Sequence, residues 1–228
     1  MRADQALADA GSSSQASAHV LAERGGGRAA GRLCGAMRVR QCEPVDRSAT
    51  ESFLARWNSL RVARLGVLQQ PLEHPALIAE EDGRLVGVLS YVVDGASCEV
   101  LTLHADVRGR GVGTALIGEV TRVATQAGCT RLWVVTTNDN IDALRFYQRR
   151  GFRLAALRRG AVDDSRTRLK PEIAEIGYHG IPLRDELELE LSLTHGPGER
   201  FALADHRHHP DLGRCSGGRT RPTRCCVA

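Results

Sequence analysis

Three glycines occupy alternate positions in the segment Arg108–Thr114, which reads Arg-Gly-Arg-Gly-Val-Gly-Thr. Because glycine lacks a Cβ atom, such a segment can turn tightly and leave its backbone N–H groups accessible. The following residues, 115–124, carry apolar side chains at helical spacing. The N–H groups are therefore expected at a helix N-terminus, where they and the helix dipole attract an anion. This pattern predicts a pyrophosphate-binding loop.

Two common nucleotide-binding loops do not match this segment. A Walker loop needs Gly-Lys-Ser/Thr, and the only lysine of the chain is Lys170. The dinucleotide loop has the spacing G-x-G-x-x-G and an acidic residue about 20 positions later. Gly109, Gly111 and Gly113 lack that spacing, and the next strand-like stretch, 130–134, ends without an acid.

A second block of residues, 138–152, follows the glycine loop after one strand-like stretch and reads NDNIDALRFYQRRGF. The pattern Arg-x-x-Gly-x-Gly, formed by Arg108, Gly111 and Gly113, resembles the acyl-coenzyme-A (CoA) pyrophosphate loop of the GNAT N-acetyltransferase superfamily. The second block resembles the N-x-x-A-x-x-F-Y-x-x-x-G-F signature of the same family. The resemblance covers roughly residues 37–193 and implies acetyl-CoA as co-substrate, with no metal ion.

The resemblance also implies which residues hold the CoA. The loop amides would bind the pyrophosphate, and the preceding strand would splay from its neighbour and offer backbone N–H groups to the pantetheine arm and the oxyanion. Asn140 would approach the pantetheine, and Ala143 would keep that helix face small. The expected cofactor-binding residues are Leu101, Leu103, Arg108, Gly109, Arg110, Gly111, Val112, Gly113, Thr114, Asn140 and Ala143.

Two side chains are candidates for proton transfer. An amine with a pKa of ~10.4 must lose its proton before it can attack a thioester. The resemblance makes Tyr147 the general acid at the departing sulfur, and the alternative is an ordinary core aromatic. Glu99, on the strand before the loop, is the candidate general base, and the alternative is a half-buried partner for an arginine. His104 has a suitable unperturbed pKa but lies beside the loop, where a capping role is equally open.

The elements that must position these groups alternate along the chain. Ser48 and Glu51 form a candidate capping box for a first helix, and Asp82-Gly83 is a hairpin signal. Asn140 can cap the second-block helix, and Gly151 is suited to its C-terminus. The predicted strands span about 37–42, 76–80, 85–93, 98–104, 131–137, 152–157 and 186–191. We therefore expect an α/β fold with a mixed, largely antiparallel twisted sheet of about six to seven strands and helices on both faces.

Composition sets the domain limits and the class of partner. Residues 1–36 are rich in Ala, Gly and Ser and predict a disordered leader, so Met37 is a candidate start, and residues 195–228 predict a disordered basic tail. The acetyltransferase domain is expected over 37–194, where 21 bases balance 21 acids although the whole chain carries +4. A neutral domain with basic tails argues against nucleic acid as a partner.

Localisation and assembly are less constrained. No apolar run approaches the roughly 18 residues of a membrane span, and the N-terminus lacks a secretory apolar core. Seven scattered cysteines predict free thiols in a reducing cytoplasm. We expect a cytoplasmic monomer or homodimer with no membrane partner.

We therefore expect an N-acetyltransferase that moves an acetyl group from acetyl-CoA to a primary amine by direct transfer in a ternary complex. One alternative is an enzyme of the same superfamily that acetylates a protein N-terminus or a lysine. The other is a non-catalytic acyl-CoA-binding regulatory module. The resemblance also implies that the acceptor is selected by the segments at about 57–75 and 158–185.

Overall fold

A computed structural model describes residues 37–106 and 109–194 of the chain. The predictions for the leader 1–36, for the tail 195–228 and for Arg108 lie outside the described residues. The strands are β1 (Arg38–Gln41), β2 (Val62–Arg64), β3 (Val67–Gln69), β4 (Ala76–Glu81), β5 (Arg84–Asp94), β6 (Ser97–Ala105), β7 (Arg131–Thr137), β8 (Arg153–Arg158) and β9 (Glu186–Ser192). The helices are α1 (Arg47–Arg56), α2 (Val112–Gln126), α3 (Ile141–Gln148) and α4 (Ala161–Arg168), with short 3-10 turns η1 (Pro44–Asp46), η2 (Pro71–Glu73) and η3 (Tyr178–Gly180).

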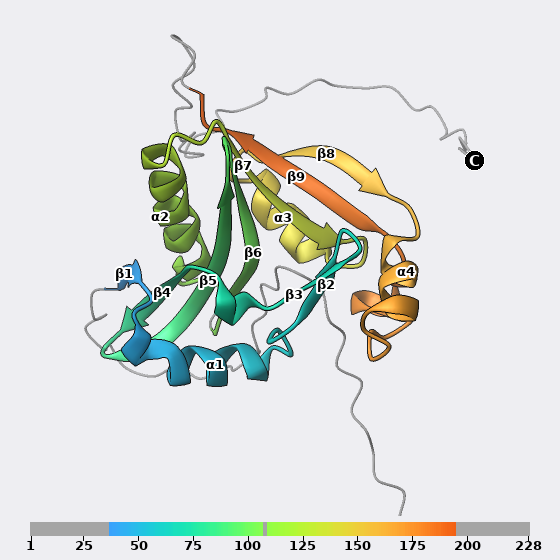
Figure 1. The fold of residues 1–228 in the computed structure, drawn as a ribbon, viewed down its shortest axis with the longest axis horizontal. Helices are drawn as coiled ribbons and strands as arrows, with labels where there is room; N and C mark the ends of the chain where they lie inside the picture. The colour runs from blue at the N-terminus through green and yellow to red at the C-terminus, as the bar shows by residue number, and fades with distance from the viewer. Residues whose placement is uncertain (1–36, 107–108, 195–228) are drawn as a thin grey trace, which may run out of the picture. The chain divides into compact units, whose positions relative to one another are not determined.

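Seven strands form one sheet in the order β1-β4-β5-β6-β7-β9-β8, and β2 pairs with β3 in a separate hairpin (Figure 1). Among the described strands only β6 and β7 run parallel, and every other neighbouring pair is antiparallel. The predicted mixed, largely antiparallel sheet is therefore confirmed.

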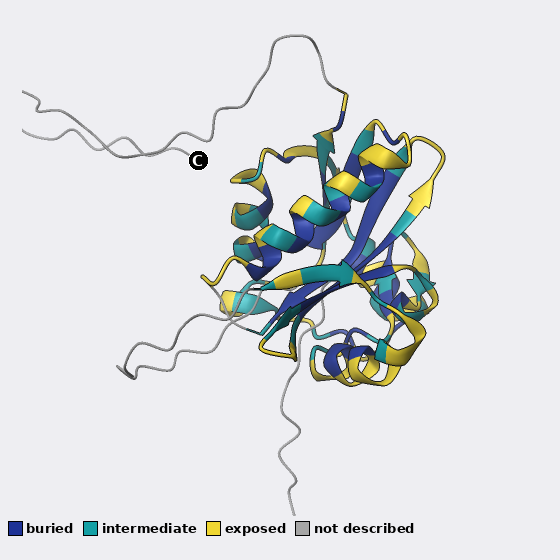
Figure 2. Ribbon diagram, turned by 90° about the vertical axis from the view of Figure 1, so that its left-hand side faces the viewer, coloured by how far each residue is buried: buried dark blue, intermediate teal, exposed yellow. Residues whose placement is uncertain are grey.

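Alternating residues of the central strands divide the core between the two faces of the sheet. Leu77 and Leu89 pack in a cluster with the apolar side of α2 and with α3. Their neighbours Ile78 and Val88 pack instead against Phe53 of α1. Figure 2 shows the buried stripes of the helices turned toward the sheet. Helices therefore cover both faces, as the period-2 alternation of the strands requires.

The first helix begins differently from the prediction. Ser48 lies inside α1, and its proposed capping box with Glu51 is wrong. The box forms one turn earlier, in η1, where Glu43 and Asp46 cap each other. The backbone N–H of Glu43 donates to Asp46 Oδ2 at 2.8 Å. Proline at position 44 favours this early start, because its fixed φ angle suits the first helical position.

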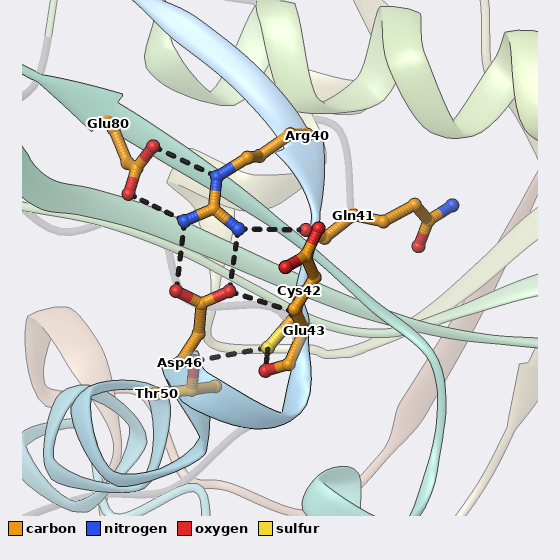
Figure 3. Close-up of polar contacts among 7 residues, drawn as sticks. All are labelled: Arg40, Gln41, Cys42, Glu43, Asp46, Thr50 and Glu80. Atoms are coloured by element: carbon orange, nitrogen blue, oxygen red, sulfur yellow. Dashed lines mark hydrogen bonds and ion pairs between the residues drawn. The ribbon is translucent and has the colours of Figure 1, made fainter.

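Asp46 also belongs to an ion-pair cluster that joins β1, β4 and the start of α1 (Figure 3). The Arg40 guanidinium donates two hydrogen bonds to Asp46, at 2.6 and 2.9 Å, and two to Glu80, at 3.1 and 2.9 Å. The hydrogen bonds that Asp46 accepts from the Arg40 guanidinium and from the backbone N–H of Glu43 lower the pKa of Asp46 to about 2. The cluster fixes the edge strand β1 to the helix that follows it.

Asp46→Asn is expected to destabilise the protein by about 1–2 kcal/mol at neutral pH, because a charge-assisted, partly buried network is lost. Because the pKa of Asp46 is lower in the folded than in the unfolded chain, its carboxylate stabilises the fold fully at pH values above the unfolded pKa of about 3.9. This stabilisation is lost as the pH falls toward 2. Urea unfolding at pH 7 and at pH 3 should therefore show a smaller difference between variant and wild type at the lower pH. Asp82→Asn, at an exposed turn residue with a φ of 51° that asparagine also tolerates, is the control and should be near neutral.

Candidate functional site

The glycine loop ends at the N-terminus of α2. Gly111 is the N-cap residue with a φ of 83°, and Gly109 has a φ of 79°. A Cβ atom built on either glycine would meet no described heavy atom within 4 Å. The left-handed backbone explains why glycine is needed here, and the open space leaves the N-terminus of α2 accessible to an anion. Arg110, at the rim of this loop, pairs with Glu81.

Gly113 has a different structural reason for being glycine. It lies within the first turn of α2, and a Cβ atom there would lie 3.0 Å from the ring of Phe146 in α3. Gly113 therefore allows α2 and α3 to approach closely. Val112, next to it, is buried in the core.

Arg150, just after α3, reaches the same helix end. Its guanidinium donates to the Thr114 hydroxyl and to the Phe146 carbonyl, the second at 2.7 Å, and lies 3.5 Å from the centre of the Phe146 ring. The dipole of α2 disfavours a cation at this end and favours an anion. Sequence reasoning did not single out Arg150, because nothing in its spacing relates it to Thr114.

The strand before the loop separates from its parallel neighbour. The ladder between β6 and β7 joins Ser97–Val100 to Arg131–Val134 and ends there, and the two strands diverge beyond it (Figure 1). On its other side, β6 shifts register against β5 so that Tyr91 pairs with Val100 and Ser90 with Thr102, which leaves Leu101 as an extra residue. The side chains of Leu101 and Leu103 are fully buried. Their backbone therefore lies along the open edge of this splay.

Tyr147 and the start of α3 lie on the α2 face of the sheet. The Tyr147 side chain is fully buried and packs edge-on against Phe146 and Phe152, with ring centres 5.1 and 5.2 Å apart. Its hydroxyl has no hydrogen-bond partner among the described residues. Burial raises the pKa of the Tyr147 phenol well above its usual value of 10, so the group stays protonated. Asn140 caps α3, as predicted, by accepting a hydrogen bond of 3.1 Å from the N–H of Ala143, which is itself fully buried.

Glu99 points to the opposite face. Its neighbours Cys98 and Val100 belong to the core cluster of Tyr147, so strand alternation directs the Glu99 side chain away from it. Glu99 is buried and forms an ion pair with Arg64 of β2. Burial raises the pKa of Glu99 to about 7, although the positive charge of Arg64 opposes the rise. A partner for an arginine was the alternative to a general base that the sequence analysis gave for Glu99.

Two glutamates of β9 lie close to this pair. Glu186 is buried and accepts hydrogen bonds from the backbone N–H of Leu65, at 3.1 and 3.2 Å. Glu188 forms ion pairs with Arg131 and Arg158. The sequence showed an alternating Glu-Leu pattern here, but only the fold shows that its glutamates face Glu99.

His104 is an interior residue of β6. Its ring is fully buried and stacks on Trp57, with ring centres 5.3 Å apart. Within residues 37–106 and 109–194, no three metal-binding side chains gather in one place. No helix among these residues is long and apolar enough to cross a membrane.

Comparison with known proteins finds one matching family model and two relatives in Bacillus subtilis. A family model described as acetyltransferase (GNAT) family matches residues 42–152. The chain is 37% identical over 139 residues to the uncharacterized protein YdhI of Bacillus subtilis, covering 60% of this chain and 86% of that protein. It is 38% identical over 113 residues to the uncharacterized protein YxbD of Bacillus subtilis, covering 50% of this chain and 70% of that protein.

Solved structures share the fold. An IAA acetyltransferase from Bacillus cereus superimposes with a TM-score of 0.54 at 20% identity, covering 69% of this chain and 99% of that one. A Bacillus subtilis acetyltransferase in complex with CoA gives a TM-score of 0.51 at 18% identity, covering 70% of this chain and 100% of that one. An acetyl-CoA-bound GNAT acetyltransferase from Elizabethkingia anophelis also gives 0.51, at 17% identity, covering 68% and 97%.

Proposed function

This chain belongs to the acetyltransferase (GNAT) family, and from that membership we propose that it transfers the acetyl group of acetyl-CoA to a primary amine of a small molecule. The transfer is direct, in a ternary complex, and residues 37–194 form the catalytic domain of a cytoplasmic enzyme. The observation that carries this proposal is a pair of buried groups that β6 separates: Tyr147 packs in the core cluster of Cys98 and Val100, and Glu99 lies between these two residues on the opposite face. A phenol without a described partner lies on one face of the sheet, and a carboxylate with a raised pKa lies on the other.

The residues present fit acetyl-CoA. The open backbone at Gly109 and Gly111, on the N-terminus of α2, suits a pyrophosphate. Arg150 adds a positive charge beside the same turn. Leu101 and Leu103 offer backbone along the splay, and the fully buried Ala143 keeps the start of α3 narrow. Acetyl-CoA supplies the activated acetyl group when it is bound.

The two buried side chains divide the proton transfers. Tyr147 keeps its proton at every usable pH, and its hydroxyl has no described acceptor, so it can donate to a departing thiolate. Glu99 titrates near neutral pH, which suits a group that removes a proton from an ammonium. Because the side chains point to opposite faces, the amine would approach from the Glu99 side and the sulfur would lie on the Tyr147 side.

The function is tested by incubating the full chain with acetyl-CoA and a panel of primary amines, amino acids and peptides, followed by mass spectrometry and an assay of released thiol. We expect a small primary amine to gain an acetyl group. Acetylation of peptides alone would instead indicate an enzyme for protein N-termini or lysines. Tight acetyl-CoA binding with no product from any acceptor would indicate a regulatory module and contradict the proposal.

A further inference from the structure

The hairpin β2–β3 brings a charged side chain from the N-terminal part of the chain to the candidate base. The hairpin belongs to the segment 57–75, which is expected to select the acceptor. It lies near α4 and near the β7–β9 part of the sheet (Figure 1). Arg64, the last residue of β2, is only 4% exposed and forms an ion pair with Glu99. An arginine cannot lose its proton in a protein, so this pair keeps a permanent positive charge beside Glu99.

The turn that follows Arg64 is held under strain. Leu65 has a φ of 51°, in the left-handed region, which is unfavourable for a residue with a side chain. Its N–H donates to the buried carboxylate of Glu186 in β9, at 3.1 and 3.2 Å. A strained residue persists where its surroundings over-determine it, and such places are often functional.

The other end of β2 is held as well. Lys170, the only lysine of the chain and 3% exposed, donates from its Nζ atom to the Arg61 carbonyl. Contacts to β6, to β9 and to the segment after α4 therefore fix the position of Arg64. The hairpin β2–β3 therefore contacts both the sheet and the segment after α4, which are distant from it in sequence.

We propose that Arg64 is a positioning residue, which holds Glu99 in its ionised form and in place to accept the proton of the acceptor amine. This inference rests on the proposed function, because it takes Glu99 as the general base. A purely structural ion pair at this depth is expected to contribute little, since the loss of hydration roughly cancels the attraction between the charges.

Several charged groups bear on the ionisation of Glu99. Arg64 of β2 favours the carboxylate, whereas Glu186 and Glu188 of β9 favour the protonated form. Arg131 of β7 and Arg158 of β8 are engaged by Glu188. Removing Arg64 must therefore raise the pKa of Glu99, and removing the charge of Glu186 must lower it.

The test is the pH dependence of kcat/KM in the full chain, measured with two acceptor amines of different pKa so that the enzyme's own acidic limb is identified. Arg64→Gln is expected to move that limb upward by about one pH unit or more and to lower kcat/KM about tenfold at neutral pH. The KM for acetyl-CoA should not change. Arg64→Lys, which keeps the charge, should restore most of the wild-type profile, and Glu186→Gln should move the limb downward.

Matched variants separate this inference from the proposed function. Arg122→Gln, at an exposed arginine of α2 that pairs with Glu119, should leave the profile unchanged. If the limb persists in Glu99→Gln, then Glu99 is not the base, and the proposed assignment fails together with the role of Arg64. If the limb vanishes in Glu99→Gln but stays in place in folded Arg64→Gln, the role of Arg64 alone is wrong. Arg64→Met replaces a glutamine variant that does not fold, and failure of both to fold would show that Arg64 is needed for folding, which overturns the proposal.

Discussion

Gly111→Val should lower the affinity for acetyl-CoA by about 100-fold or more, which is roughly 3 kcal/mol at 1.4 kcal/mol per tenfold. Gly111 caps α2 with a φ of 83°, a conformation that a β-branched residue adopts only under strain. Its missing Cβ faces a space in which no described atom lies within 4 Å. A valine would place its methyl groups in that space, where the proposed pyrophosphate binds. Isothermal titration calorimetry with acetyl-CoA measures the effect.

Gly95→Val is the matched control for backbone strain. Gly95 also has a positive φ, 54°, and also faces a space without described atoms within 4 Å, but it lies in the β5–β6 turn, before the opposite end of β6. Valine there should lower the melting temperature and leave acetyl-CoA affinity unchanged. Undiminished affinity in folded Gly111→Val would contradict the pyrophosphate assignment. Gly113 is a poor choice for this test, because a side chain there would press on Phe146 and disturb the packing of α2 on α3.

Local patterns in the sequence predicted most of the sheet. The predicted strands at about 76–80 and 85–93 correspond to β4 and β5, and the structure shows that their alternate side chains pack in two cores. The alternate glycines predicted a tight turn at a helix N-terminus, and the structure places Gly109 and Gly111 there with left-handed backbone. The amide of Asn140 predicted the cap of α3 in the same way.

Contacts between distant segments could not be predicted. The partnership of Arg64 with Glu99 joins residues whose strands belong to different sheets, and neither side chain has a local pattern that identifies the other. The hairpin β2–β3 and the helix α4 escaped prediction because their short elements bury few apolar residues and show weak periodicity. Ser48 and Asp46 are both suitable residues for a helix N-terminus. The ion pair of Asp46 with Arg40 of β1 favours Asp46, and this contact is visible only in the fold.

The proton-transfer side of the site is tested most directly at Tyr147. Tyr147→Phe should lower turnover by about 10²-fold or more, the usual scale for a positioned acid, provided that chemistry limits the rate. Acetyl-CoA affinity should hold roughly steady, because the ring keeps its packing against Phe146 and Phe152. The buried hydroxyl has no described partner, so its removal should leave stability equal or slightly higher. If Tyr147 were purely structural and its hydroxyl hydrogen-bonded, Tyr147→Phe would instead lower stability and leave turnover unchanged.

Tyr91→Phe is the control for loss of a buried phenol. Tyr91 is 5% exposed, and its hydroxyl exchanges hydrogen bonds with the side chain of Gln41, at 3.0 and 3.3 Å. Its loss should cost about 1 kcal/mol of stability and leave turnover unchanged, because a satisfied hydrogen bond is removed outside the proposed site. Single-turnover kinetics on the identified amine separates chemistry from product release in both variants. Wild-type single-turnover rates in Tyr147→Phe would show that the sulfur leaves unaided, as a thiolate of pKa near 8.5 can, and that Tyr147 serves the core alone.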